Sequence, residues 1–315
     1  MAGILVTGGG GFIGAAVVEA LAARGDSVVA FDLAESERLR TLGAAHPSIE
    51  FAPGELTEWP QLAETFRRCR PDAVVHCAAI VGVVNSLASP MATMRVNVEG
   101  SLNVLAAMRL FEVKRLVNLS TEEVYGPFLA ERIDESHPCR PSKPYGISKF
   151  AVEQLCRDEA ATHGTSITHV RTCWVYGPGL PRPRVPKILI DAALAGRPLR
   201  LPKGGDFRVD HVYIADVVQG ILKALDVPTT PSDVYHVATG EAPSLTEIVA
   251  IVRELVPGAE LAIGPGHYAF ADGVEPVRKG ALDISRARSE LGYAPRYDIR
   301  SGLAAYLEAR RSGSG

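Results

Sequence analysis

The sequence predicts an α/β protein with a doubly wound parallel sheet, followed by a smaller mixed α/β C-terminal domain that binds substrate. Strand-like runs alternate with helical stretches along the first half of the chain. These runs are continuously apolar, as expected when helices cover both faces of a sheet. A glycine-rich turn joins the first run to the first helix. The 315 residues are enough for one large or two modest domains.

Strands are expected at residues 4–7, 27–32, 49–52, 73–77, 115–119 and 167–171, and the first helix at 15–23. The segment 177–186 is too rich in proline for a helix or a central strand, so it marks a boundary. Later helices are expected at 187–195, 245–255 and 285–291. We therefore predict domains at 1–176 and 177–315, with some segments of the second returning to the sheet.

The glycine-rich turn has the spacing of a dinucleotide-binding site. Gly8, Gly11 and Gly14 stand in the pattern G-x-x-G-x-x-G after an apolar strand and before a helix. In such a turn the first glycine allows the tight bend, the second lets backbone N–H groups approach a pyrophosphate, and the third permits close helix–strand contact. The first domain is therefore predicted to be a Rossmann domain.

Asp32 closes the second predicted strand, 24 residues after Gly8. An acidic side chain there accepts hydrogen bonds from the adenosine ribose and repels a 2′-phosphate. Because no Arg or Lys lies in the glycine turn or directly after Asp32, the sequence favours NAD over NADP. An alternative role for Asp32 is that of a helix N-cap, with Glu35 as its N3 partner.

Tyr145 and Lys149 are four residues apart, which places a phenol and an ammonium group on one helix face. A nearby cation stabilises a phenolate and lowers the tyrosine pKa. The pair is therefore a candidate acid/base group for a substrate hydroxyl.

Composition argues against several other classes of protein. A net charge of −3 gives no basic field for nucleic acid or a membrane surface. The five cysteines include no C-x-x-C pair and the eight histidines show no H-E-x-x-H spacing, so no metal is expected. The first strand follows Met1 almost directly and leaves no room for a signal peptide, so we expect a cytoplasmic protein with reduced thiols.

Seven segments together resemble the extended short-chain dehydrogenase/reductase family, also called the NAD-dependent epimerase/dehydratase family. They are TGGGGFIG at 7–14, HCAA at 76–79, NVEG at 97–100, LSTEEVYG at 119–126, YGISK at 145–149, VYGP at 175–178 and VYIADV at 212–217. The resemblance covers essentially the whole chain. It implies that Thr121 helps to hold the reacting oxygen and that Tyr145 is the acid/base. It also implies that Lys149 binds the nicotinamide ribose and tunes Tyr145.

The resemblance also implies a set of NAD-binding residues and a homodimer. Ala78 and Ala79 would lie beside the cofactor, and Asn97 would bend a helix or relay protons. Glu55 stands where the family usually has an aspartate near the adenine. The implied cofactor set is Gly8, Gly11, Phe12, Ile13, Gly14, Asp32, Leu33, Glu55, Leu56, Ala78, Ala79, Asn97, Tyr145 and Lys149. The homodimer would form through helices near 90–111 and 145–163.

Two carboxylates follow Thr121. Simple 4-epimerases of the family usually carry small uncharged residues here, whereas Thr121-Glu122-Glu123 resembles the Thr-Asp-Glu of nucleotide-sugar 4,6-dehydratases and the Thr-Ser-Glu of uronate decarboxylases. By that resemblance Glu122 is the acid for a leaving hydroxyl and Glu123 the base at carbon 5. Adjacent carboxylates raise one another's proton affinity, which suits such a pair. The alternative is that one of them is a solvated loop carboxylate.

The substrate side departs from the family pattern. Trp174 stands where nucleotide-sugar members usually have Asn, and Val209 where they often have Arg. In the family, both of these residues contact the diphosphate of the sugar nucleotide. Side chains that could supply a substitute positive charge are Arg182, Arg184, Lys187, Arg208 and Arg278. We expect an NAD-dependent enzyme that modifies a sugar, foremost a nucleotide sugar, through a transient ketone. The alternatives are a one-way dehydrogenase of a free sugar acid or polyol, with Trp174 filling part of the pocket, and a non-catalytic dinucleotide sensor.

Overall fold

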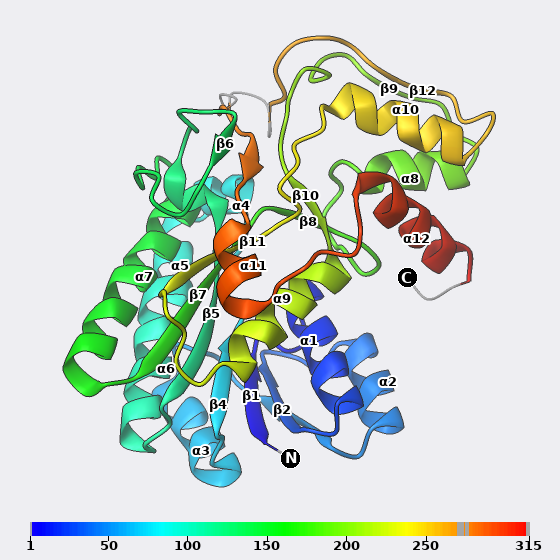
Figure 1. The fold of residues 1–315 in the computed structure, drawn as a ribbon. Coiled ribbons are helices and arrows are strands. Elements are labelled where there is room, and N and C mark those ends of the chain that lie inside the picture. Colours follow the sequence, from blue (N-terminus) through cyan, green and yellow to red (C-terminus); the bar gives the residue numbers. More distant parts are fainter. Residues whose placement is uncertain (1, 270–273, 275–276, 313–315) are drawn as a thin grey trace.

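The fold is seen in a computed structural model that describes residues 2–269, 274 and 277–312. Its centre is a parallel sheet of seven strands, with smaller strand pairs in the C-terminal part (Figure 1). The predicted fold class, a doubly wound parallel α/β sheet with a mixed C-terminal part, is confirmed.

The large sheet has the order β11-β7-β5-β4-β1-β2-β3, and every neighbouring pair is parallel. Its strands are β1 (Gly3–Thr7), β2 (Ser27–Asp32), β3 (Ile49–Pro53), β4 (Ala73–His76), β5 (Arg115–Thr121), β7 (Ser166–Thr172) and β11 (Val234–Val237). All six expected runs form strands of this sheet, with ends that differ by at most two residues. The seventh, β11, returns from the C-terminal part and pairs with β7.

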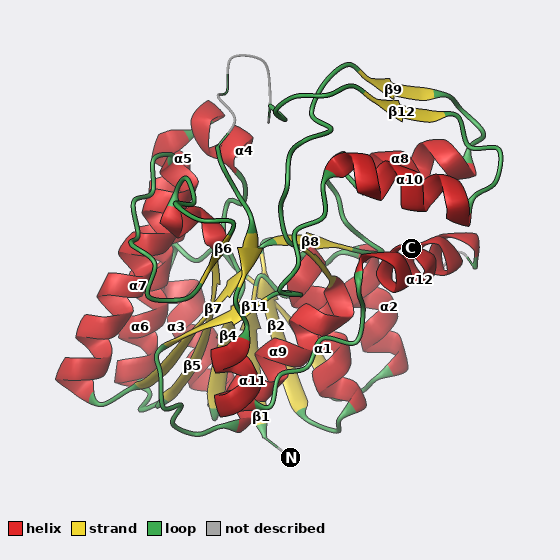
Figure 2. Cartoon of the chain, turned by 45° about the horizontal axis from the view of Figure 1, so that its top comes forward, coloured by secondary structure: helices red, strands yellow, loops and turns green. Residues whose placement is uncertain are grey.

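Helices cover both faces of the sheet (Figure 2). The side chains of the strands alternate between these two faces. In β1, Leu5 belongs to one core cluster, while Ile4 and Val6 belong to the other. The first face is covered by α3 (Trp59–Cys69), α6 (Gly100–Leu110) and α7 (Pro144–His163). The opposite face is covered by α1 (Phe12–Ala23), α9 (Ile214–Asp226) and α11 (Ser285–Leu291). This two-sided burial explains the apolar runs of β1, β2 and β4, whereas β5 and β7 also bury polar residues such as Asn118 and His169.

The rest of the C-terminal part lies beyond the carboxyl ends of the strands (Figure 1). Its elements are α8 (Lys187–Leu194), α10 (Leu245–Leu255), α12 (Ile299–Arg311) and the strands β8 (Trp174–Tyr176), β9 (Leu199–Leu201), β10 (His211–Tyr213) and β12 (Leu261–Ile263). The strands β6 (Arg132–Ile133) and β13 (Ala281–Leu282) pair beside the site. The remaining helices are α2 (Glu37–Ala45), α4 (Val83–Ala88) and α5 (Pro90–Met94).

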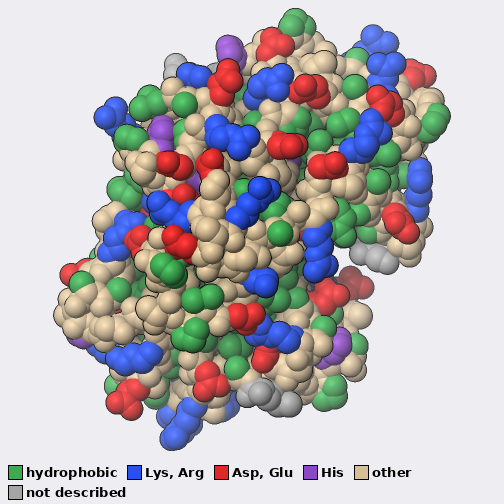
Figure 3. Space-filling model, in the orientation of Figure 1, with side chains coloured by type: hydrophobic (Ala, Val, Ile, Leu, Met, Phe, Trp, Pro, Cys, Tyr) green, Lys and Arg blue, Asp and Glu red, His purple; other side chains and the backbone are tan. Residues whose placement is uncertain are grey.

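Charged side chains of both signs are interspersed over the face shown in Figure 3. This mixture agrees with the small net charge of −3. Within the described part of the chain, no helix combines the length and the apolar character needed to cross a bilayer.

Candidate active site

A cleft of about 940 Å³ lies at the carboxyl ends of the sheet strands. Residues that follow β1, β3 and β4 line it, together with the last residues of β2, β5 and β7. The chain runs outward from β1 to β3 and then restarts at β4 on the other side of β1, and such a reversal is where open α/β sheets bind ligands. Residues 180–184 belong to its substrate side.

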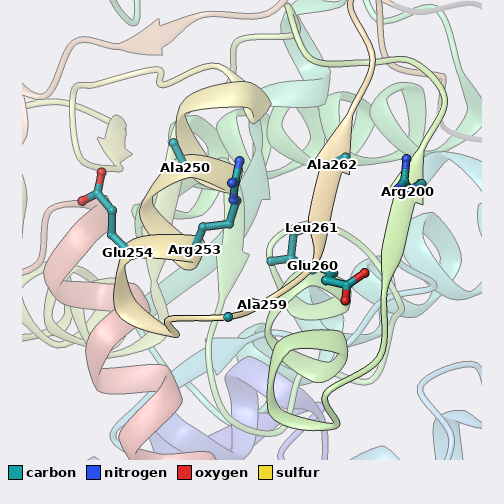
Figure 4. A pocket seen from close by; sticks show the side chains of 9 residues that line it. Arg200, Ala250, Arg253, Glu254, Ala259, Glu260, Leu261 and Ala262 are labelled. Carbon is teal, nitrogen blue, oxygen red and sulfur yellow. The ribbon is translucent and has the colours of Figure 1, made fainter.

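A second hollow, of about 730 Å³, lies in the C-terminal part between α10, β9 and β12 (Figure 4). Arg200, Arg253 and Glu260 are among the side chains around it. Because no residue proposed from the sequence lines this hollow, the cleft at the sheet edge is the candidate active site.

The glycine turn leaves space that larger residues would fill. Gly8 has a φ of +69°, and a Cβ there would lie 2.7 Å from the backbone of Ala78. A Cβ on Gly14 would lie 2.0 Å from the carbonyl oxygen of Gly8. Gly11 is the N-cap of α1, and no side chain caps this helix or places a negative charge in its first turn. Its free N–H groups can therefore receive an anion such as a pyrophosphate.

Asp32 is held by the turn and does not cap a helix. Its Oδ2 accepts from the N–H of Gly10 at 2.9 Å, and its Oδ1 accepts from the N–H of Leu33 at 2.8 Å. The helix α2 starts later, with Ser36 as its N-cap, so the alternative of an Asp32 cap with Glu35 at N3 is wrong. The adenosine side of the cleft is lined by Phe12, Ile13, Asp32, Leu33, Glu55 and Leu56.

Beyond β4, Ala78 and Ala79 line the cleft, but Asn97 does not. Asn97 is buried in a π-helical turn, Arg95–Glu99. Its Oδ1 accepts from the N–H of Ile80 at 2.7 Å, and its Nδ2 donates to Ser148 Oγ at 2.9 Å. The side chain therefore ties the loop after β4 to α7 from behind the cleft.

Tyr145 and Lys149 lie one turn apart at the start of α7, and both line the cleft. Burial raises the pKa of Tyr145 to about 12, against the opposing effects of Arg182 and a hydrogen bond with Thr121. Burial also lowers the pKa of Lys149 to about 8. The shift of Tyr145 is opposite to the one expected from its spacing to Lys149, because desolvation outweighs the nearby positive charges.

Glu122 and Glu123 open a 3₁₀ turn, Glu122–Tyr125, directly after β5, and both line the cleft. The hydroxyl of Thr121 accepts from the N–H of Glu123 at 3.3 Å. The side chains of Glu122 and Glu123 are only 1% and 13% exposed, so the alternative of a solvated loop carboxylate is wrong. Burial raises the pKa of Glu122 to about 8.

Sequence reasoning missed Lys279, which lies between these two carboxyl groups. Its Nζ is 3.3 Å from Oε1 of Glu123 and 3.8 Å from Oε1 of Glu122, and its side chain is fully buried. Arg278, one residue earlier, was expected as a substrate-binding charge; it is exposed and does not line the cleft. A chemical argument could have pointed to Lys279, because two carboxyl groups buried side by side need a buried cation near them.

On the substrate side, Arg184 stacks on Trp174, with its guanidinium carbon 4.7 Å from the ring centroid. Burial lowers the pKa of Arg184 to about 10, and its Nε has no hydrogen-bond partner among the described residues. Arg182 donates to the carbonyl of Val81 at 3.2 Å. All three predicted side chains, Trp174, Arg182 and Arg184, line the cleft, where the arginines can receive an anionic group.

Two other predicted charges lie away from the cleft. Arg208 pairs with Glu247 at 3.1 Å in an exposed position. Lys187 pairs with Asp191 on α8. The structure thus brings together two of the five proposed substrate cations, Arg182 and Arg184.

A buried polar network supports the site from behind. Arg171 donates from Nε and Nη2 to the two oxygens of Glu153, at 2.9 and 2.5 Å. Ser120, next to Thr121, donates to Glu153 at 2.6 Å, and Arg171 also donates to the hydroxyl of Tyr125 at 2.7 Å. That hydroxyl contacts Nε2 of His236 on β11. The network joins β5, the 3₁₀ turn, α7, β7 and β11 around the candidate catalytic residues.

Comparison with known proteins shows a family. Residues 4–238 match the model of the NAD dependent epimerase/dehydratase family. A UDP-glucose 4-epimerase from Mycolicibacterium smegmatis is 30% identical over 98% of this chain and 99% of its own length.

Two solved structures are similar along the whole chain. The UDP-glucose 4-epimerase of Thermotoga maritima with UDP-glucose has a TM-score of 0.89, at 28% identity over 99% of this chain and 100% of its own. The dTDP-glucose 4,6-dehydratase DesIV of Streptomyces venezuelae, solved with NAD and TYD, has a TM-score of 0.86, at 28% identity over 99% and 98%.

The matched region includes the glycine turn, the residues after β5 and the start of α7, which together form the cleft. The alternative of a non-catalytic sensor is therefore dropped, and the predictions of an enzyme and of NAD are confirmed. The chain belongs to the NAD dependent epimerase/dehydratase family.

Proposed function

We propose that this enzyme oxidises a secondary alcohol of a nucleotide sugar to a transient ketone and then epimerises or dehydrates the sugar. The observation that carries this proposal is the position of Glu122 and Glu123 in the same cleft as Thr121 and Tyr145. A simple dehydrogenase needs one group to remove the hydroxyl proton. A second reaction next to the ketone needs further acid and base groups, and the two glutamates supply them.

In the first step, Tyr145 takes the proton of the substrate hydroxyl while Thr121 holds the same oxygen. Lys149 lies on the same helix face as Tyr145 and supplies positive charge beside the reacting groups. The glycine turn and Asp32 fit NAD, because the turn offers backbone donors to a pyrophosphate and Asp32 can accept from ribose hydroxyls. A bound NAD would supply the chemistry of taking up a hydride from the substrate carbon and giving it back.

In the second step, Glu123 removes the proton on the carbon beside the ketone, since that proton is acidified by the carbonyl. In a dehydration, Glu122 donates its proton to the leaving hydroxyl, and water is released. Burial favours the neutral, proton-bearing form of Glu122, as this role requires.

The substrate class rests on the cleft and on the relatives. The relatives compared above act on UDP-glucose or dTDP-glucose, as their names state. Arg182 and Arg184 provide two positive charges for a diphosphate, and the buried Nε of Arg184 lacks a protein partner among the described residues. We further propose that residues 1–176 mainly hold the cofactor and that 177–315 mainly provide the substrate domain.

One observation favours a second candidate, a one-way dehydrogenase of a sugar acid. Trp174 is only 3% exposed and packs against Phe207 and Tyr268, so a large aromatic group occupies the position of the usual asparagine. A short substrate with a carboxylate could then pair with Arg184 directly.

Incubation with UDP-hexoses, dTDP-hexoses and free sugar acids, followed by NADH absorbance and product analysis, separates the two candidates. We expect an isomerised or dehydrated nucleotide sugar without net NADH release. An oxidised product with one equivalent of released NADH would replace this proposal with the dehydrogenase.

Glu123→Gln gives a sharper test of the second step. We expect NAD binding and the first oxidation to persist while turnover falls by roughly 10²- to 10⁴-fold, so that enzyme-bound NADH accumulates when substrate is present. Glu64→Gln is the matched control, because Glu64 lies exposed on α3 and pairs with Arg67. Normal turnover in Glu123→Gln would remove the assigned role.

We also infer a homodimer and a reducing compartment such as the cytoplasm. The helices α5, α6 and α7 pack side by side and expose Met91, Leu102, Leu110 and Ile147. Two copies of this face would form a helical interface, and light scattering at low concentration measures it. All five cysteines are free, as in proteins of reducing compartments.

A further inference from the structure

We infer that Lys279 is a positioning residue that divides the two carboxyl groups between their roles, holding Glu123 as the carboxylate base and leaving Glu122 as the neutral acid. This inference rests on the second step proposed above. It assigns a function to a buried lysine that no family motif in the sequence includes.

The geometry of the three side chains is asymmetric. The Nζ of Lys279 is 0.5 Å closer to Glu123 than to Glu122, at 3.3 against 3.8 Å. Glu123 also keeps 13% exposure, whereas Glu122 keeps 1%. One buried cation can offset one buried carboxylate, and the second carboxyl group avoids the cost of desolvation by remaining protonated. Distance and exposure both make Glu123 the ionised partner.

The backbone fixes the position of Lys279. A Cβ on the next residue, Gly280, would lie 2.1 Å from the carbonyl oxygen of Glu131, so the two segments touch there. The carbonyl of Arg278 accepts from the N–H of Phe128 at 2.8 Å, and the ring of Phe128 lies 5.3 Å from Nζ of Lys279. These contacts fix the backbone on both sides of Lys279 and place its ammonium group beside the ring of Phe128.

Of the other charged groups around the trio, Asp210 favours a neutral Glu122, whereas Arg184 opposes it. Asp210 lies on the Glu122 side and is itself held by N–H groups of Thr239 and Gly240, so a second negative charge beside it is disfavoured. Tyr145 faces Glu123 from α7. The titratable or charged groups that face the trio are Tyr145, Cys173, Arg184 and Asp210. Arg184 attracts Glu122, but it is stacked on Trp174.

The first test measures melting temperature at pH 7 and needs no substrate, so it stands even if the proposed reaction is wrong. Glu123→Gln removes the charge partner of Lys279, and we expect a loss of about 5 °C. Glu122→Gln replaces a neutral group by a neutral group, and we expect a change within about 2 °C. Lys279→Met combined with Glu123→Gln should recover stability relative to Glu123→Gln alone. An equal or greater loss in Glu122→Gln would overturn the assignment.

The second test follows the pH dependence of turnover. Without Lys279, the base at Glu123 loses its cation, so the acidic limb of the pH–rate profile should move up by at least about one pH unit in Lys279→Met. Lys279→Arg should restore it, and Lys223→Met, exposed on α9, is the charge-matched control. A uniform loss of rate across pH, with no movement of the limb, would show a merely structural role. Should Lys279→Met fail to fold, the two glutamine variants still decide the question.

Discussion

The cofactor wall of the cleft is shaped by close backbone contacts at glycines, whereas the substrate wall carries long charged side chains beside its aromatic ones. On the cofactor wall, Gly8 and Gly14 bring two backbone segments into contact, and Asp32 is fixed by two N–H groups. On the substrate wall, Arg184 holds positive charge that burial makes costly, and the buried Lys279 pairs with Glu123 without lining the cleft itself. The first wall can recognise a ligand common to many enzymes, while the second is where the reaction and substrate are selected.

The largest expected effect concerns Tyr145, where the two walls meet. Tyr145→Phe keeps the ring but removes the group that exchanges a proton, so kcat should fall by about 10³-fold. NAD affinity, measured by calorimetry, should change by less than about threefold. A variant that keeps its turnover would show that another group is the acid/base.

The next effect is confined to the substrate wall. Arg184→Met removes a cation that can form charge-assisted hydrogen bonds, so KM for the substrate should rise by about 10²-fold. NAD affinity should stay the same. Arg208→Met is the comparison, because that arginine lies outside the cleft and pairs with Glu247. Equal increases of KM in the two variants would show that Arg184 does not bind the substrate.

Buried charge should also make the substrate wall sensitive to pH. The pKa of Glu122 is raised by burial from 4.5 to about 8, so its neutral form is favoured in the folded state. The stabilisation it provides is complete below the unfolded value and is lost as pH rises towards 8. Glu122→Gln stays neutral, so its free energy of unfolding should gain about 2 kcal/mol relative to the wild type between pH 6 and 8. Urea titrations at both pH values measure this gain, and a constant difference would contradict it.

The smallest effect belongs to the cofactor wall. Asp32→Ser removes the charge that repels a 2′-phosphate, so the preference for NAD over NADP should narrow by about tenfold. Turnover with saturating NAD should change little. Equal affinity of the unchanged protein for the two cofactors would show that Asp32 has another role.

The contrast between the walls also explains what could be predicted from the sequence. The cofactor wall follows local rules, because the spacing of Gly8, Gly11 and Gly14 and the end of β2 are set within 32 residues. The substrate wall depends on contacts across the chain, such as Glu123 with Lys279. In the sequence, Arg278 and Lys279 are adjacent cations, and only the folded structure shows that Lys279 is buried while Arg278 is exposed.

Some local predictions also failed, for physical reasons. The sequence allowed Asp32 to cap the following helix, but α2 begins at Glu37 and its N-cap is Ser36. The spacing correctly predicts that Tyr145 and Lys149 lie one turn apart on a helix. It contains no information about desolvation, which decides the direction in which the pKa of Tyr145 shifts. Residue patterns indicate which groups lie near one another, whereas burial is a property of the whole fold.

The late position of β11 in the chain has a consequence for how the protein is made on the ribosome. Strand β7 ends at Thr172, and β11, which covers its outer edge, begins at Val234. At roughly 5–20 residues per second, the intervening 61 residues take about 3–12 s to synthesise. During that interval the nascent chain presents the open hydrogen-bonding edge of the seven-residue strand β7, which is a template for aberrant pairing. Chains that end between these two strands should therefore aggregate more readily than the full-length protein.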